Sequence, residues 1–173
     1  MKKGLLIILS GPSGVGKGTV RSHFVKKEEL NIAFSVSMTT RTQRLGEVDG
    51  KDYFFVDRKR FLEAVDQDEL LEYAEFVGNY YGTPTIAVED LRNQGKNVLL
   101  EIEVQGASQV KAKVPDALTI FLVPPSMDEL EKRIRGRRTE DEEIVQKRLA
   151  KAKKDLPKHV AIDQALADLE RLV

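Results

Sequence analysis

The sequence has no cysteine, no net charge and no long hydrophobic run, and each absence excludes a class of protein. Without cysteine the chain can form neither a disulfide, nor a thiolate nucleophile, nor a zinc-thiolate site, which fits a reducing compartment. Its 28 basic and 28 acidic side chains cancel, so no net field draws it to nucleic acid or to an anionic membrane. The longest apolar run, residues 5–9, is too short to cross a bilayer or to serve as a signal peptide. We therefore expect a cytoplasmic protein that binds neither nucleic acid nor membranes.

The remaining composition suits a single folded unit, since 173 residues with 41% hydrophobic content can bury one core. Apolar runs at residues 5–9, 98–102 and 118–123 alternate with amphipathic stretches, which predicts a parallel sheet covered by helices. Residues 35–83 instead mix short aromatic and β-branched pieces with turn signals, and they indicate a small β-rich insertion. Residues 126–129 have the spacing of a capping box and predict a helix start.

A glycine-rich segment directly after the first predicted strand and directly before a helical stretch predicts a phosphate-binding loop. Glycines let consecutive N–H groups point at a phosphate, the helix N-terminus adds its positive end, and Lys17 can reach the β- and γ-phosphates. Gly18 stands where the general pattern has Ser or Thr, so Mg²⁺ would be held by Thr19 or mainly by phosphates and water. The predicted ATP-binding residues are Gly11, Ser13, Gly14, Val15, Gly16, Lys17, Gly18 and Thr19.

Such a loop occurs in ATPases, GTPases and nucleotide kinases, so the choice among them depends on the rest of the chain. The Asn-Lys-x-Asp element typical of GTPases is absent from the sequence. The pairs Phe54–Phe55 and Tyr80–Tyr81 are expected to split, with one member packing in the insertion and the other facing the site. The insertion concentrates residue types that bind anions and read bases, which suits a nucleoside monophosphate: Ser37, Thr39, Thr40, Arg41, Arg44, Tyr53, Glu72, Tyr81 and Thr83.

Residues 35–53 read SVSMTTRTQRLGEVDGKDY and residues 78–83 read GNYYGT, and both segments resemble guanylate kinase. The resemblance covers most of the chain, from about residue 4 to residue 149. It implies an α/β, P-loop NTPase-type three-layer fold with a parallel central sheet, a small β-rich GMP-binding domain inserted in it and a mobile lid. The implied boundaries are residues 1–34 and 85–173 for the P-loop core, 35–84 for the GMP-binding domain and about 135–143 for the lid.

The resemblance also implies which residues recognise the guanine base. Guanine presents N1–H and N2–H₂ donors beside an O6 acceptor, so a carboxylate can accept from the donors while a hydroxyl donates to O6. Glu72 is implied as that carboxylate, with Ser37 and Thr83 as hydroxyl partners and Glu103 as a further candidate for the amine. Glu101, at the end of the second predicted strand, is implied to lie in the GMP site near Mg²⁺ or its water shell.

Arginines are implied at both phosphate ends of the site. Arg133 and Arg137 are four residues apart and share a helix face if their helix continues, and with Arg148 they are implied to close over ATP. Together with Lys17 and Arg41 they form the predicted catalytic set. The α-phosphate of GMP is a dianion that suits forked, cationic donors, and its implied clamp is Arg41, Arg44, Tyr53 and Tyr81.

The implied activity is ATP-dependent phosphorylation of GMP and dGMP by direct in-line transfer, with Mg²⁺ as cofactor and ATP and GMP as small-molecule partners. The alternative is a guanylate-kinase-like module that binds phosphopeptides without catalysis. Such modules typically degrade the phosphate-binding loop, whereas this loop is intact, so the enzyme is the favoured interpretation. The sequence leaves the oligomeric state open, a homodimer being one alternative.

The resemblance ends near Pro157. Members of the family continue into another strand that ends in Asn-Asp, whereas residues 156–162 here lead directly into a predicted final helix at residues 163–172. The missing strand would flank the adenine side of the site and the edge of the sheet. Three alternatives follow: the chain is natively short, it is truncated, or an internal segment of the full protein is missing from this sequence.

Overall fold

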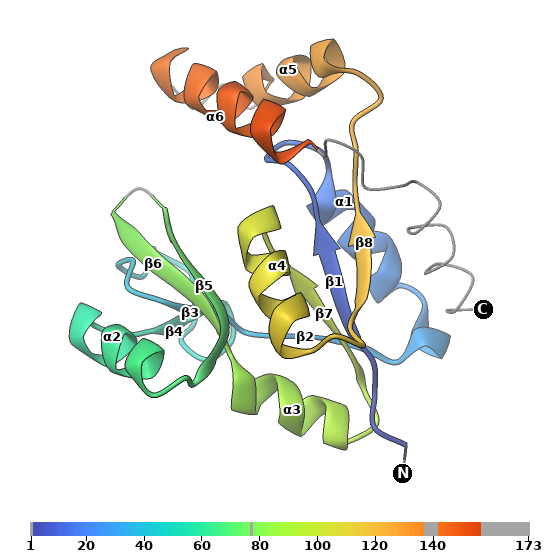
Figure 1. Cartoon of the computed structure of the whole chain (residues 1–173), viewed down its shortest axis with the longest axis vertical. Coiled ribbons are helices and arrows are strands. Elements are labelled where there is room, and N and C mark those ends of the chain that lie inside the picture. Colours follow the sequence, from blue (N-terminus) through green and yellow to red (C-terminus); the bar gives the residue numbers. More distant parts are fainter. Residues whose placement is uncertain (1, 77, 137–141, 157–173) are drawn as a thin grey trace.

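Two four-stranded sheets organise the part of the chain that the computed structural model describes, residues 2–76, 78–136 and 142–156 (Figure 1). The central sheet has the strand order β2-β7-β1-β8, and all of its strands are parallel. Its members are β1 (Leu6–Ser10), β2 (Ile32–Phe34), β7 (Asn97–Glu101) and β8 (Leu118–Phe121). The three apolar runs of the sequence thus form β1, β7 and β8, as predicted, with boundaries that differ by one or two residues.

Helices cover both faces of the central sheet, which makes the core three-layered. Leu6 and Ile8 of β1 pack on one face with α3 (Thr85–Asn93) and α4 (Val104–Lys113). Ile7 and Leu9 point to the opposite face, where α1 (Lys17–Val25) packs. Because both faces are covered, β1 is buried along its whole length and its sequence is continuously apolar up to Ser10.

The second, smaller sheet has the order β4-β3-β6-β5 and is largely antiparallel. It contains β3 (Met38–Thr39), β4 (Phe54–Phe55), β5 (Leu70–Phe76) and β6 (Asn79–Pro84). Helix α2 (Arg58–Asp66) packs on it through Phe61 and Ala64, and begins where the Asp57 carboxylate accepts the Arg60 N–H at 2.7 Å. The prediction of a β-rich segment was correct for the strands but did not include this helix.

Helices α5 (Met127–Arg135) and α6 (Glu142–Asp155) lie together at the end of the molecule above the loop that follows β1 (Figure 1). The Ser126 hydroxyl accepts the Glu129 N–H at 3.1 Å, which confirms the predicted helix start. Leu130 and Ile134 then pack with apolar residues of α6 and with Val15 of the loop. Arg137, most of the predicted lid and the predicted final helix lie outside the described residues.

Within the described ranges, no helix combines the length and apolar character needed to cross a membrane.

Candidate functional site

The loop between β1 and α1 has the backbone conformation that a phosphate-binding loop requires. Gly11, Gly14 and Gly16 have φ values of 146°, 84° and 108°, a region that residues with a Cβ rarely adopt. A Cβ at Gly14 would also lie 2.7 Å from the Ile134 side chain, so the loop fits closely beneath α5. The helix N-terminus that follows has no side-chain cap, and its N–H groups remain available to an anion.

Lys17 is the first residue of α1 and the loop curls around its ammonium group. The Nζ atom donates hydrogen bonds to the carbonyl oxygens of Gly11 at 2.6 Å and Pro12 at 3.2 Å. Burial lowers the pKa of Lys17, while the negative charges of Glu101, Glu103 and Asp155 oppose that shift. The lysine is thus a partly buried cation that faces several carboxylates across the site.

A cavity of about 290 Å³ lies between the two sheets, and Lys17 lines it. Its wall combines the loop after β1, the carboxyl end of β7, the first turn of α4 and the strands β5 and β6. Parallel strands of an open α/β sheet commonly place ligands at their carboxyl ends, as here. The lining includes eight of the residues predicted from sequence: Ser13, Lys17, Ser37, Tyr53, Glu72, Tyr81, Glu101 and Glu103.

Glu72 is the most buried acidic group in this cavity. It is 7% exposed, and its Oε1 accepts a 2.6 Å hydrogen bond from the hydroxyl of Thr83, which is fully buried on the neighbouring strand β6. Burial raises the pKa of the Glu72 carboxyl; the Thr83 hydrogen bond lowers it, and the nearby charge of Glu103 raises it. A buried carboxylate with unused acceptor capacity suits a ligand that brings N–H donors. The Thr83 hydroxyl proton is directed at Glu72 in this arrangement.

Arg41 lies at the side of the cavity formed by Tyr53. Its guanidinium carbon is 5.3 Å from the Tyr53 ring centroid and 5.6 Å from that of Phe55. The same group donates to Glu47 at 2.7 Å, and the Glu47 carboxylate also accepts the Arg44 N–H at 2.8 Å. These hydrogen bonds hold the pKa of Glu47 below its ordinary value. Neither the Arg41 nor the Arg44 side chain lines the cavity itself.

Glu47 is a site residue that the sequence analysis did not single out. The available signal was a carboxylate three and six residues after two arginines, within a segment rich in turn-forming residues. The structure shows why it matters: Glu47 holds Arg41 in place beside the aromatic wall. The expected split is confirmed for the tyrosines, since Tyr80 packs in the small-sheet core and Tyr81 lines the cavity. Phe54 also packs in that core, while Phe55 lies beside Arg41 and does not line the cavity.

Two charged contacts join the α5–α6 pair to the rest of the site. Arg133 donates to the Val15 carbonyl of the loop at 3.0 Å and to the Glu129 carboxylate at 2.8 Å. Lys151 of α6 pairs with Glu103, the residue that precedes α4. Arg148 also lies on α6 and is partly buried. The structure thus places Arg133 at the loop.

The residues predicted near Mg²⁺ occupy different parts of this region. Glu101 lines the cavity, and its carboxylate is 3.7 Å from the Arg21 guanidinium, a residue that the sequence analysis also missed. Thr19 is exposed, two residues after Lys17, and does not line the cavity. Among the described residues no cluster of three acidic, histidine or cysteine side chains could bind a metal by itself. Any metal here would need the ligand's phosphates and water as further ligands.

Comparison with known proteins identifies the family. A family model described as guanylate kinase matches residues 3–171. The chain belongs to the guanylate kinase family. It is 56% identical to a guanylate kinase from Streptococcus thermophilus over 155 residues, which covers 90% of this chain and 74% of that protein. It is 52% identical to one from Enterococcus faecalis over 169 residues, covering 98% of this chain and 83% of the relative.

A solved structure agrees with this assignment. The crystal structure of guanylate kinase from Anaplasma phagocytophilum matches with a TM-score of 0.62 and 34% identity, covering 95% of this chain and 94% of that one. The guanylate kinase relationship thus holds for both sequence and fold, and the chain is a nucleoside monophosphate kinase, an ATP:GMP phosphotransferase. The P-loop fold implied by the sequence is confirmed.

Proposed function

We propose that this guanylate kinase phosphorylates GMP and dGMP by a single in-line transfer from the Mg²⁺ complex of ATP, with Glu72 reading the base. The observation that carries the proposal is the shared cavity, whose wall includes both the buried Glu72 carboxylate and the Lys17 ammonium. A base-reading group and a phosphate-binding group on one wall would place an acceptor phosphate next to the donor.

The guanine base would lie against β5. Glu72 accepts N1–H and N2–H₂, and its negative charge strengthens both hydrogen bonds. The Ser37 hydroxyl, which lines the same cavity, donates to O6, while Thr83 keeps the Glu72 carboxylate in position. Glu103 lines the cavity as a second acceptor for the amine, and the pairing with Lys151 holds it at that edge. Adenine offers no N1–H, so AMP would leave the Glu72 charge unpaired.

The α-phosphate of GMP would be held by the Arg41 side of the cavity. Tyr53 and Tyr81 line this wall, with ring centroids 6.1 Å apart, and each offers a phenolic donor. Arg41 supplies the positive charge, and the Glu47 carboxylate that now binds it would share it with the phosphate. Arg44 would join this clamp from the adjacent loop. No general base is needed, because the phosphate is already an anionic nucleophile.

The phosphates of ATP would lie in the loop of residues 11–19. Lys17 would exchange its carbonyl partners for β- and γ-phosphate oxygens, and Arg133, already at the Val15 carbonyl, would neutralise charge on the migrating group. Arg137 and Arg148 complete the proposed arginine set. The residues present fit Mg²⁺, which would neutralise phosphate charge, with Glu101 and the Thr19 hydroxyl reaching it through water.

A coupled assay of ADP release tests this function with GMP, dGMP, AMP, CMP and UMP as acceptors. We expect turnover with GMP and dGMP, little with the other acceptors, and none when EDTA removes the divalent metal. Transfer from ATP that is chiral at the γ-phosphorus should invert the configuration, as a single in-line displacement requires. Equal use of AMP would contradict the base assignment, and retention of configuration would contradict direct transfer.

A further inference from the structure

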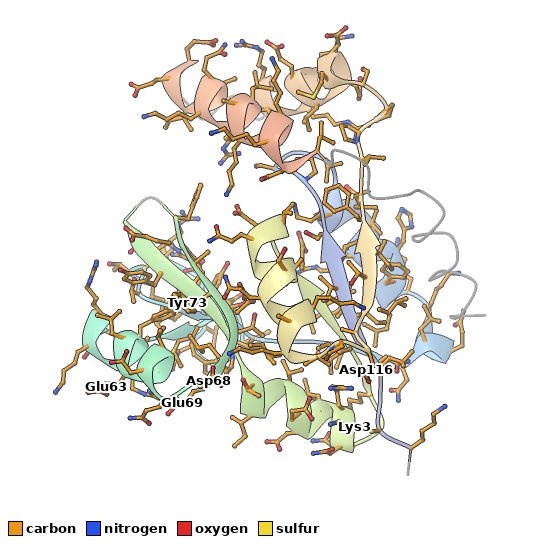
Figure 2. The ribbon with its side chains drawn as sticks, in the orientation of Figure 1. Lys3, Glu63, Asp68, Glu69, Tyr73 and Asp116 are labelled. Carbon is orange, nitrogen blue, oxygen red and sulfur yellow. The ribbon has the colours of Figure 1, made fainter. Side chains whose placement is uncertain are left out.

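Helix α4 belongs to the core, yet one of its faces lies along β5, the edge strand of the small sheet (Figure 1). The Gln109 amide accepts the Tyr73 N–H at 3.1 Å and donates to the Tyr73 carbonyl at 3.0 Å, as a neighbouring strand would. One turn further, Lys113 donates to the Leu70 carbonyl at 2.7 Å and pairs with Asp68. Figure 2 labels Tyr73, which belongs to β5, and Asp68, which lies two residues before that strand.

The same face of α4 carries Gly106, and Gly106 lies directly against Glu72. Gly106 is buried, lines the cavity and is three residues before Gln109, so both residues face β5. A Cβ built at this glycine would lie 2.6 Å from Oε2 of Glu72 and 3.2 Å from its Cδ. Oε1 of the same carboxylate is held by Thr83, so Gly106 bounds the carboxylate on the other side.

The surroundings determine what would move if residue 106 had a side chain. Gln109 and Lys113 bind the backbone of β5, which opposes a shift of α4 away from that strand. The Glu72 carboxylate is the end of a flexible side chain, so the carboxylate is the group that would yield. Glycine is a poorer helix former than alanine, so a glycine inside α4 is explained by this packing and not by helix stability.

We infer that Gly106 is a specificity-determining positioning residue: its lack of a side chain leaves the space in which the Glu72 carboxylate meets guanine. This inference rests on the proposed role of Glu72. In this inference Gly106 acts only through the position of that carboxylate. A methyl group there would displace the acceptor oxygens from the N1–H and N2–H₂ donors while leaving the fold and the ATP-binding loop unchanged.

The test is Gly106→Ala, assayed with GMP and with inosine monophosphate, which lacks the exocyclic amine. We expect kcat/KM for GMP to fall about tenfold or more, mainly through KM, because sub-ångström to ångström displacements of binding groups have effects of this size. Use of inosine monophosphate should change less, so the preference for GMP shrinks. The KM for ATP should stay unchanged, and the thermal midpoint should not fall. Ser108→Ala, an exposed change on the same helix, is the matched control.

A double-mutant cycle with Glu72→Asp separates positioning from general damage. Asp is one methylene shorter and withdraws from the added methyl group, so Gly106→Ala should have little further effect in the Glu72→Asp protein. Independent, multiplying effects would overturn the inference, as would a Gly106→Ala protein that keeps the full preference for GMP over inosine monophosphate. If the unsubstituted protein itself uses the two acceptors equally, the proposed reading of guanine fails together with this inference.

Discussion

At the scale of single residues, the site contains two ionisable groups, and burial disfavours the charged form of each. The pKa of Glu72 is raised and the pKa of Lys17 is lowered, each chiefly by burial. Groups that are perturbed in this way within one cavity are candidates for function, since a folded protein gains little stability from them. Here the cavity that joins them is also lined by six further residues predicted to bind nucleotides.

The raised pKa of Glu72 predicts a pH-dependent cost to stability. Because its folded-state pKa lies above the ordinary value, the folded protein binds more protons than the unfolded chain between those two pKa values, and stability rises as the pH falls. Glu72→Gln should therefore raise the thermal midpoint at neutral pH. That advantage should disappear below the ordinary pKa of a glutamate.

The matched control is Glu75→Gln, an exposed carboxylate on the same strand. The thermal midpoints of both variants and of the unsubstituted protein would be measured from about pH 4 to about pH 8. This range extends from just below the ordinary glutamate pKa of about 4.3 to above neutrality. A Glu72→Gln protein that is less stable at neutral pH, or whose advantage persists at the acid end, would contradict the assignment of a desolvated carboxylate.

Lys17→Met should abolish most turnover without unfolding the chain. The methionine keeps the apolar stem but loses the ammonium group that now binds Gly11 and Pro12. Loss of one charged donor to a reacting group typically lowers kcat by about 10²–10³-fold. Rapid-quench measurement of phosphoryl transfer, with circular dichroism as the check on folding, should show that loss in the chemical step. A kcat within threefold of the unsubstituted value, a bound we set well inside the ~10²-fold effect, would exclude the role.

Residue types were easier to predict than residue partners. The sequence indicated Lys17 through the local motif of the phosphate-binding loop, and the resemblance to the family implied Glu72. Three residues were missed because their importance comes from partners that only the fold brings near. Glu47 pairs with Arg41 across a loop, and Arg21 lies beside Glu101 of β7. Gly106 of α4 lies against the Glu72 carboxylate of the small sheet. No spacing rule within one segment contains that information.

At the scale of elements, burial determined which strands could be predicted. β1, β7 and β8 are continuously apolar because helices cover both faces of their sheet, and each was found from sequence. β2 was missed, since it has only three half-buried residues and no long apolar run. Helix α2 was missed as well, because its stripe of Phe61 and Ala64 is narrow and it lies inside a segment with strand-like composition.

The prediction at the scale of elements concerns Arg133 on helix α5. It lies so that Arg133 reaches the Val15 carbonyl, while Arg135 on the same helix pairs with Glu131 and with Glu142 of α6. Arg133→Lys keeps the charge but loses the fork that can bind a carbonyl, a carboxylate and a phosphate oxygen together. We expect kcat to fall about 10²-fold with little change in the KM for GMP.

Arg135→Lys is the matched control for that experiment, because it alters an exposed ion pair between Arg135 and Glu142 that the proposed site does not use. Steady-state kinetics of both variants, with saturating ATP, would give the comparison. Equal losses in the two variants would show that α5 acts through the stability of the helix pair and not through the Arg133 guanidinium.

At the scale of the whole molecule, function depends on how two sheets share one cavity. Helix α4 joins them, since it packs on the central sheet and also binds the edge of the small sheet. The sequence predicted an inserted segment with its own residues for the acceptor, but it could not predict that α4 would form part of that site's wall. Contacts between distant segments depend on how complete helices and strands pack together. The hydrophobic periodicity within one helix or strand contains no information about that packing.

The central claim is that Glu72 selects guanine in a cavity shared with Lys17, and the most direct test is the ratio of kcat/KM for GMP to that for AMP in Glu72→Gln and in the unsubstituted protein. Replacing the carboxylate oxygens that accept two guanine donors by an amide should lower kcat/KM for GMP by about 10²-fold, since hydrogen bonds to charged groups contribute about 1.5–3 kcal/mol each. Use of AMP should not fall, because the amide removes the charge that AMP leaves unpaired, so the ratio should collapse. A ratio that stays within twofold, again far inside the ~10²-fold effect, would contradict the account.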